Sequence, residues 1–172
     1  MPNNIFIDKK KIILGSANFS LKYGLANNFS KINLKEIKKI ISSCEKNDIN
    51  FIDTSKGYGR SEKIIGNLKN KKWNIITKIP KNKLKKKKDI EIHIFNLIED
   101  SLNKLQVRSL YAVLLHDENQ LLRKNAVFVY DILQKLKKNK LVKKIGVSFY
   151  SPKKLINIIS KFNIDLVQIP IN

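Results

Sequence analysis

Residues 110–116, with the sequence LYAVLLH, form an almost uninterrupted apolar run that ends in a histidine. A run of this kind is typical of a strand in a parallel sheet whose two faces are both covered. The neighbouring segments Asp89–Leu105 and Leu122–Lys138 instead place apolar side chains at helical spacing. The order helix, buried strand, helix predicts an α/β fold built around this strand.

The same alternation extends along the rest of the chain. Further strands are predicted at Ile12–Gly15, Asn50–Thr54, Trp73–Lys78, Lys144–Ser148 and Asp165–Ile169, with a possible short strand at Ile5–Ile7. The remaining helices are predicted at Asn33–Asn47, where Asn33 and Glu36 have the spacing of a capping box, at Ser61–Lys69 and at Pro152–Phe162. Six main strands with five helices between them predict parallel strands and right-handed crossovers in one domain over residues 1–172.

Length and composition exclude several classes of protein. A closed eight-unit β/α barrel takes about 250 residues, and this chain has 172. No apolar run has the roughly 18 residues of a membrane-spanning helix, and the N-terminus lacks the apolar region of a secretory signal. One cysteine, Cys44, and two histidines argue against disulfides and against a structural zinc site. We therefore expect a cytoplasmic protein that has no metal site and does not bind membranes.

The strongly basic balance has two readings. The net charge is +21, but only three of the 35 basic residues are arginine, the side chain that nucleic-acid recognition favours. The lysines are spread among many isoleucines and asparagines, which indicates a compositional bias more than a binding surface. The densest run, Lys81–Lys88, is interpreted as a solvated loop, with contact to an anion or a membrane surface as the alternative.

Polar residues close the predicted strands at one consistent position. The strand-closing residues are Gly15, Asp53, Lys78, His116, Ser148 and Gln168, separated by gaps of 20 to 38 residues, close to one β/α unit each. In a parallel sheet these residues gather at the carboxyl edge, where ligands bind in both barrel and open α/β folds. Each also has a simpler reading as a turn, cap or solvated residue, but an acid, an ammonium and an imidazole at one edge predict a functional site.

The chain resembles the aldo-keto reductase family from about Lys11 to its last residue. The resemblance rests on DTSKGYGRSEKIIG at residues 53–66, ITK at 76–78 and SLNKLQVRSLYAVLLHD at 101–117, and it is extended by ILGSANF at 13–19, GVSFYSP at 146–152 and VQIPIN at 167–172. The family is a (β/α)₈ barrel of TIM type that reduces carbonyl compounds with a nicotinamide cofactor, usually NADPH. The resemblance thus implies an incomplete barrel of this type here.

The resemblance also implies site residues. The catalytic tetrad of the family falls on Asp53, Tyr58, Lys78 and His116. Hydride transfer to a carbonyl creates an alkoxide that must be protonated, and a tyrosine hydroxyl, with an ordinary pKa of about 10, can do this when a nearby ammonium stabilises its phenolate. Asp53 would hold Lys78, and His116 would donate a hydrogen bond to the carbonyl oxygen of a small-molecule substrate.

Cofactor and substrate contacts follow from the same resemblance. Ser148 and Gln168 match the positions that hold the nicotinamide carboxamide, Asn172 and Gly15 are expected beside the NADPH, and Tyr23 is expected to contact substrate. The family's last two β/α units, which bind the cofactor phosphates, have no counterpart, so we expect a truncated copy of such an enzyme and leave open whether it is active or inactive. Two alternatives stay open: a lyase or isomerase that uses Lys78 as a Schiff-base amine, and a basic polyanion-binding module.

Overall fold

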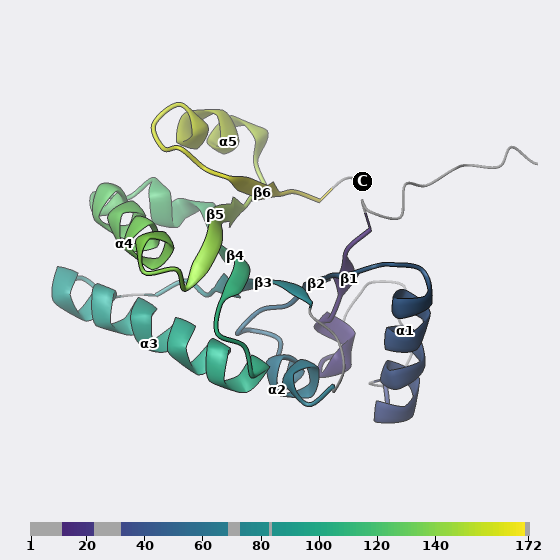
Figure 1. The fold of residues 1–172 in the computed structure, drawn as a ribbon. Helices are drawn as coiled ribbons and strands as arrows, with labels where there is room; N and C mark the ends of the chain where they lie inside the picture. The colour runs from purple at the N-terminus through teal and green to yellow at the C-terminus, as the bar shows by residue number, and fades with distance from the viewer. Residues whose placement is uncertain (1–11, 23–31, 69–72, 83, 171–172) are drawn as a thin grey trace, which may run out of the picture.

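A curled sheet of six parallel strands forms the centre of the molecule (Figure 1). The computed structural model describes residues 12–22, 32–68, 73–82 and 84–170. The strands are β1 (Leu14–Gly15), β2 (Phe51–Asp53), β3 (Asn74–Ile79), β4 (Leu110–Leu115), β5 (Val142–Ser148) and β6 (Leu166–Gln168). They lie side by side in chain order, as in a (β/α) barrel and unlike a doubly wound sheet, whose first strand is internal. The predicted incomplete barrel is confirmed.

Five helices connect the strands and cover the outer side of the sheet (Figure 1). They are α1 (Leu34–Lys46), α2 (Ser61–Gly66), α3 (Lys87–Leu105), α4 (Ala126–Lys138) and α5 (Pro152–Ile159), with short 3₁₀ helices η2 (Ala17–Phe19) and η3 (Glu118–Leu121). The capping box of α1 is confirmed, because Asn33 Oδ1 accepts from the backbone N–H of Glu36 at 3.0 Å and the Glu36 carboxylate accepts from the backbone N–H of Asn33 at 3.1 Å.

The two faces of the sheet have different interiors. Successive side chains of a strand point to opposite faces, so in β4 Val113 and Leu115 join the large core beneath the helices. Ala112 and Leu114 face the other way and pack with Ile76 in a small second cluster on the inner face of the curl. Three partly buried side chains, Phe51, Tyr111 and Leu166, pack against this second cluster.

The register of the strands brings polar groups onto that inner face. Asp53, the last residue of β2, lies opposite Ile76 of β3, and Lys78 lies opposite Leu114 of β4. Because residues two apart share a face, Asp53 and Lys78 both point to the inner side. At the other edge, Ser148 of β5 lies opposite Gln168 of β6.

Some element boundaries differ from the predicted ones. The helix predicted from Leu122 begins four residues later, at Ala126, because residues 122–125 form a turn that is closed by the backbone N–H of Ala126 donating to the carbonyl oxygen of Arg123 at 2.9 Å. The helix predicted to reach Phe162 ends at Ile159. The short strand predicted at residues 5–7 lies outside the described residues.

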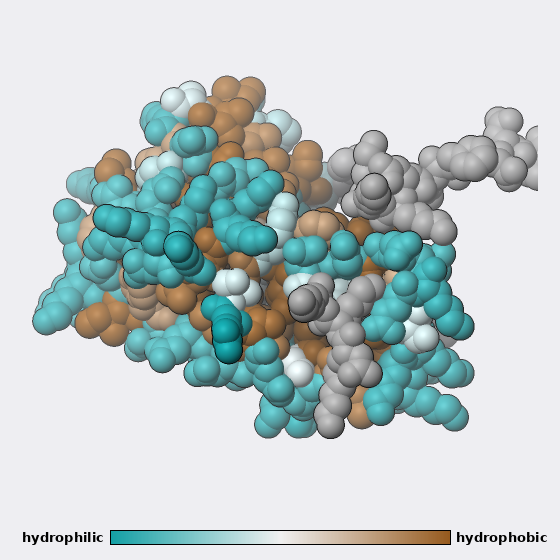
Figure 2. Space-filling view, viewed as in Figure 1, coloured by the Kyte–Doolittle hydropathy of each residue, from teal (hydrophilic) through white to brown (hydrophobic). Residues whose placement is uncertain are grey.

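Hydrophilic side chains cover most of the face seen in Figure 2, with apolar patches between them. Two of the exposed apolar side chains, Ile156 and Ile159, belong to α5. Among the described helices, none has both the length and the apolar character needed to cross a bilayer.

Candidate functional site

A buried lysine–aspartate pair occupies the inner face of the sheet. The Lys78 side chain is 2% exposed, and its Nζ lies 2.6 Å from both Oδ1 and Oδ2 of Asp53. The same ammonium donates to the carbonyl oxygen of Thr54 at 3.2 Å, so three acceptors match its three donor hydrogens. Burial lowers the pKa of Lys78, while the charge and hydrogen bonds of Asp53 oppose that shift.

Tyr58 lies above this pair, in the loop between β2 and α2. Its backbone N–H donates to the carbonyl oxygen of Ser55 at 2.9 Å, and its own carbonyl oxygen accepts from the N–H of Ser61 at the start of α2 at 3.1 Å. Gly59 follows with a φ of +58°, a left-handed conformation that glycine adopts without strain. The turn brings Lys78 Nζ to 5.2 Å from the centre of the Tyr58 ring.

His116 completes the group at the end of β4. Its backbone N–H donates to the carbonyl oxygen of Ile79 at 2.9 Å, which continues the β3–β4 pairing. Its ring centre is 6.1 Å from that of Tyr58, and the two rings meet edge to face at 80°. Burial and the positive charge of Lys78 lower the pKa of His116, against the weaker opposing effects of Asp53 and Asp117. This lowering favours the neutral imidazole.

Sequence reasoning missed one side chain of this group, Ser55. It is 1% exposed, and its Oγ lies 3.3 Å from His116 Nδ1 and accepts from the backbone N–H of Gly57 at 3.1 Å. Its position directly after the Asp53-Thr54 pair was the only available signal, since a serine in a polar turn has no distinguishing pattern in the sequence.

A second missed group lies behind the site, on the helix side of the sheet. Glu62 of α2 is 3% exposed and accepts from Thr77 Oγ1 and Ser101 Oγ, both at 2.8 Å. Its other oxygen lies 3.6 Å from Nζ of Lys56, which also pairs with Asp100. The buried carboxylate thus ties together β3, α3 and the loop that carries Tyr58.

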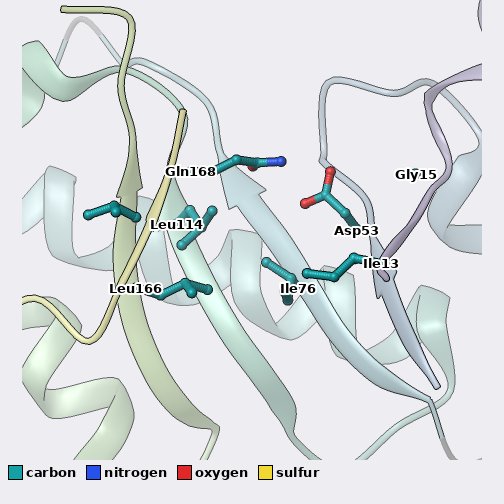
Figure 3. Close-up of a pocket in the computed structure, with 8 residues that line it drawn as sticks. Ile13, Gly15, Asp53, Ile76, Leu114, Leu166 and Gln168 are labelled. Atoms are coloured by element: carbon teal, nitrogen blue, oxygen red, sulfur yellow. The ribbon is translucent and has the colours of Figure 1, made fainter. Parts of the chain in front are cut away.

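Three residues expected beside the cofactor lie around the inner face. Two of them, Gly15 and Gln168, line a hollow of about 180 Å³ between β1 and β6, together with the catalytic candidate Asp53. Figure 3 shows the polar ends of Asp53 and Gln168 at the mouth of this hollow, above apolar side chains. Ser148, 6% exposed, lies beside Gln168 in the sheet. The other two expected contacts, Tyr23 and Asn172, lie outside the described residues.

Among the residues that the structure describes, no group of three or more histidine, cysteine, aspartate or glutamate side chains is placed to hold a metal ion.

Comparison with known proteins assigns the family. The sequence model of the aldo/keto reductase family matches residues 11–172, almost the whole chain. The chain belongs to the aldo/keto reductase family. The family assignment agrees with the position of the four polar side chains at the carboxyl ends of the strands.

Solved structures of aldo-keto reductases have the same fold as this family member. A putative aldo-keto reductase from Pseudomonas aeruginosa superimposes with a TM-score of 0.72 at 22% identity, over 91% of this chain and 61% of its own length. A glycerol dehydrogenase from Gluconobacter oxydans gives 0.66 at 24% identity, over 93% and 51%. A Bombyx mori aldo-keto reductase solved in complex with NADP gives 0.65 at 17% identity, over 94% and 54%.

This aldo/keto reductase chain spans about half to three-fifths of the length of those three neighbours. No curated protein matches its sequence. At these identities the neighbours establish the shared fold, and the activity has to be argued from the residues themselves.

Proposed function

We propose that this chain carries the catalytic residues of an NADPH-dependent reductase that converts an aldehyde or ketone to an alcohol. The observation that carries the proposal is the position of the Lys78 ammonium, which lies between both carboxylate oxygens of Asp53 and the ring of Tyr58. An ammonium held in this way is a means of making a tyrosine hydroxyl a better acid.

Tyr58 is the proton donor in this proposal. Its ordinary pKa of about 10 is high for acid–base work near neutrality, and a positive charge 5.2 Å from its ring centre stabilises the phenolate that remains after proton transfer. Asp53 contributes indirectly: burial lowers the pKa of Lys78, and the charge and hydrogen bonds of Asp53 oppose this shift and favour the charged ammonium.

His116 is the group that orients the carbonyl. It is neutral because burial and Lys78 lower its pKa, so one ring nitrogen carries a hydrogen and can donate it to the substrate oxygen. A fixed donor at the atom where negative charge develops stabilises the transition state.

The inner face also suits a nicotinamide ring. A carboxamide needs both donors and acceptors, which the Ser148 hydroxyl and the Gln168 amide supply from neighbouring positions of β5 and β6. The hollow beside them, lined by Gly15 and Asp53, has a mostly apolar floor. When bound, the dihydronicotinamide supplies the hydride. We keep Asn172 as a further cofactor contact and Tyr23 as a substrate contact.

The proposal includes a small-molecule carbonyl as substrate and the cytoplasm as location. The proposed location rests on the sequence having a single cysteine, Cys44, so that no disulfide can form within the chain. A Schiff-base role for Lys78 is less well supported, because its Nζ is bound by both oxygens of Asp53 and its side chain is 2% exposed. A substrate carbonyl would have to displace a buried ion pair to reach it.

The test needs two proteins, because the chain covers only part of its neighbours' length. One is the 172-residue chain. The other is the same chain joined to the last two β/α units of the Pseudomonas aeruginosa neighbour. We expect the joined protein to oxidise NADPH when an aldehyde is added, and the 172 residues alone to bind NADPH weakly in a fluorescence titration.

Tyr58→Phe in the joined protein is the decisive variant. Loss of the proton donor acts in the transition state, so kcat is expected to fall about 100-fold to 10,000-fold with little change in NADPH binding. Tyr130→Phe is the matched control, since that hydroxyl bonds to Gln134 and to the carbonyl oxygen of Asn163, on the helix side of the sheet. Full turnover in Tyr58→Phe would remove Tyr58 from the acid role, and borohydride trapping of substrate on Lys78 would favour the Schiff-base alternative.

A further inference from the structure

Ser55 is a buried side chain that the proposed reaction does not use. It lies in the loop after β2, 61 residues from His116 in sequence, yet its Oγ is 3.3 Å from His116 Nδ1. With 1% exposure it is closed off from solvent. A buried hydroxyl needs protein partners, so the direction of its hydrogen bonds can be worked out from its neighbours.

The hydroxyl group has one hydrogen to donate and two lone pairs to accept with. The backbone N–H of Gly57 donates to Ser55 Oγ at 3.1 Å and uses one lone pair. The hydrogen remains, and His116 Nδ1 is the acceptor within reach in the described part of the chain. If Nδ1 carried the hydrogen and donated to Ser55, the serine hydrogen would be buried without an acceptor, which is unfavourable.

The other polar groups near His116 already have partners. Asp117 Oδ1 accepts from the backbone N–H and the side-chain amide of Asn119 at 2.9 and 2.6 Å, and its other oxygen lies 3.4 Å from Lys81 Nζ. Asp53 is bound to Lys78 through both oxygens. In the described residues the hydrogen-bond contact of His116 Nδ1 is Ser55 Oγ, and neither carboxylate is bonded to that nitrogen. Burial and Lys78 lower the pKa of His116, so the neutral ring carries a single N–H.

We propose that Ser55 is a positioning residue that holds His116 as the tautomer with its hydrogen on Nε2. A hydrogen bond accepted at one ring nitrogen places the hydrogen on the other. The Nε2–H is then the donor available to a substrate oxygen, a consequence that rests on the proposed function. Ser55 touches neither substrate nor cofactor in this scheme. It acts by determining which ring nitrogen can donate.

Long-range ¹H–¹⁵N NMR correlation of the histidine rings tests the tautomer directly. The spectrum is recorded at pH 7.5 on the 172-residue chain carrying His93→Gln, so that His116 gives the only ring signals. We expect Nδ1 to resonate as an unprotonated nitrogen and Nε2 as a protonated one. The opposite pattern, or an average of the two, would overturn the proposal without any variant of Ser55.

Three variants in the same background assign the effect. Ser55→Ala is expected to move the Nδ1 signal toward the protonated position, and Ser55→Thr, which keeps a hydroxyl, is expected to retain the Nε2–H pattern. Ser61→Ala is the matched control, because it removes another buried hydroxyl, one that donates to the carbonyl oxygen of Ser16 at 2.8 Å. An unchanged spectrum in Ser55→Ala, or an equal change in Ser61→Ala, would overturn the proposal.

The measurement is independent of turnover. It needs neither NADPH nor substrate. If the joined protein has no reductase activity while the 172-residue chain shows the Nε2–H pattern, the proposed function is contradicted and the role of Ser55 remains. If the joined protein is an active reductase but His116 carries its hydrogen on Nδ1, the role of Ser55 is contradicted and the proposed function remains. If Ser55→Ala does not fold, the parent spectrum together with Ser55→Thr still decides the outcome.

Discussion

Thr77 and Lys78 are neighbours in β3 whose side chains bind two different carboxylates on opposite faces of the sheet. Thr77 Oγ1 donates to Glu62 at 2.8 Å on the helix side, and Lys78 Nζ donates to Asp53 at 2.6 Å on the inner side. Strand β3, which carries Lys78, is therefore also hydrogen-bonded on the helix side of the sheet, to the buried carboxylate of Glu62 in α2. Stability and site geometry are coupled through these two adjacent residues.

Glu62→Ala is expected to destabilise the chain strongly. The substitution leaves the hydroxyls of Thr77 and Ser101 without their acceptor and removes one of the two carboxylates that pair with Lys56. Each buried hydroxyl left without its acceptor costs about 1–3 kcal/mol. Urea unfolding followed by circular dichroism measures the loss. Glu45→Ala, at an exposed position of α1, is the control, and equal unfolding midpoints for the two variants would contradict the assigned role.

Gly66→Ala is expected to loosen the contact between α2 and α3. A Cβ at Gly66 would lie 2.1 Å from the backbone carbonyl oxygen of Lys104, so the helices would have to separate. Overpacking of this kind costs about 1–3 kcal/mol. Gly15→Ala is the matched control, since a Cβ there meets nothing within 4 Å. Thermal unfolding should show a lower Tm for Gly66→Ala and an unchanged Tm for Gly15→Ala. A comparable fall in the Tm of Gly15→Ala would mean that loss of glycine's backbone freedom, and not the contact between α2 and α3, is the cause.

His116 is expected to make stability dependent on pH below about 6.5, the ordinary pKa of histidine. Burial and Lys78 lower its pKa in the folded chain. As the pH falls from about 6.5 toward that lowered value, the unfolded chain binds a proton that the folded chain does not. The free energy of unfolding therefore decreases on acidification, by at most about 1.4 kcal/mol per pH unit for one group.

Urea titrations between pH 7.5 and 5 measure this slope. His116→Gln should flatten it, whereas His93→Gln should leave it as in the parent chain. The aspartates with lowered pKa values, Asp100, Asp117 and Asp165, titrate below this window. The same slope in His116→Gln and in the parent would show that another group is responsible.

Asn33→Ala is expected to cost about 1 kcal/mol of stability, because it removes the acceptor for the N–H of Glu36 at the first turn of α1. Asn157→Ala, at an exposed position within α5, should be neutral or slightly stabilising since alanine has the higher helix propensity. Chemical unfolding of both variants compares the two, and a loss of stability in Asn157→Ala equal to that in Asn33→Ala would mean that capping is not the cause.

The carboxyl-end positions of Asp53, Lys78 and His116 follow from the sequence, because each closes a strand that its apolar residues define. Ser55 and Glu62 could not be found in this way. Ser55 meets His116 across 61 residues of chain, and Glu62 lies on a short helix where a carboxylate ordinarily faces water. The helix boundary at Ala126 was also missed, because residues 122–125 form a turn closed by a backbone hydrogen bond from Ala126 to Arg123, which the apolar spacing does not reveal.

The sequence by itself determined the order of strands and helices, their parallel direction and the edge at which the polar residues gather. These depend on hydrophobic periodicity and on the chirality of the crossovers, which act along the chain. The tertiary structure alone decided which groups touch. The register that places Asp53 opposite Ile76 and brings Lys78 to it, and the contact of α2 with α3 that buries Glu62, depend on packing between segments far apart in sequence.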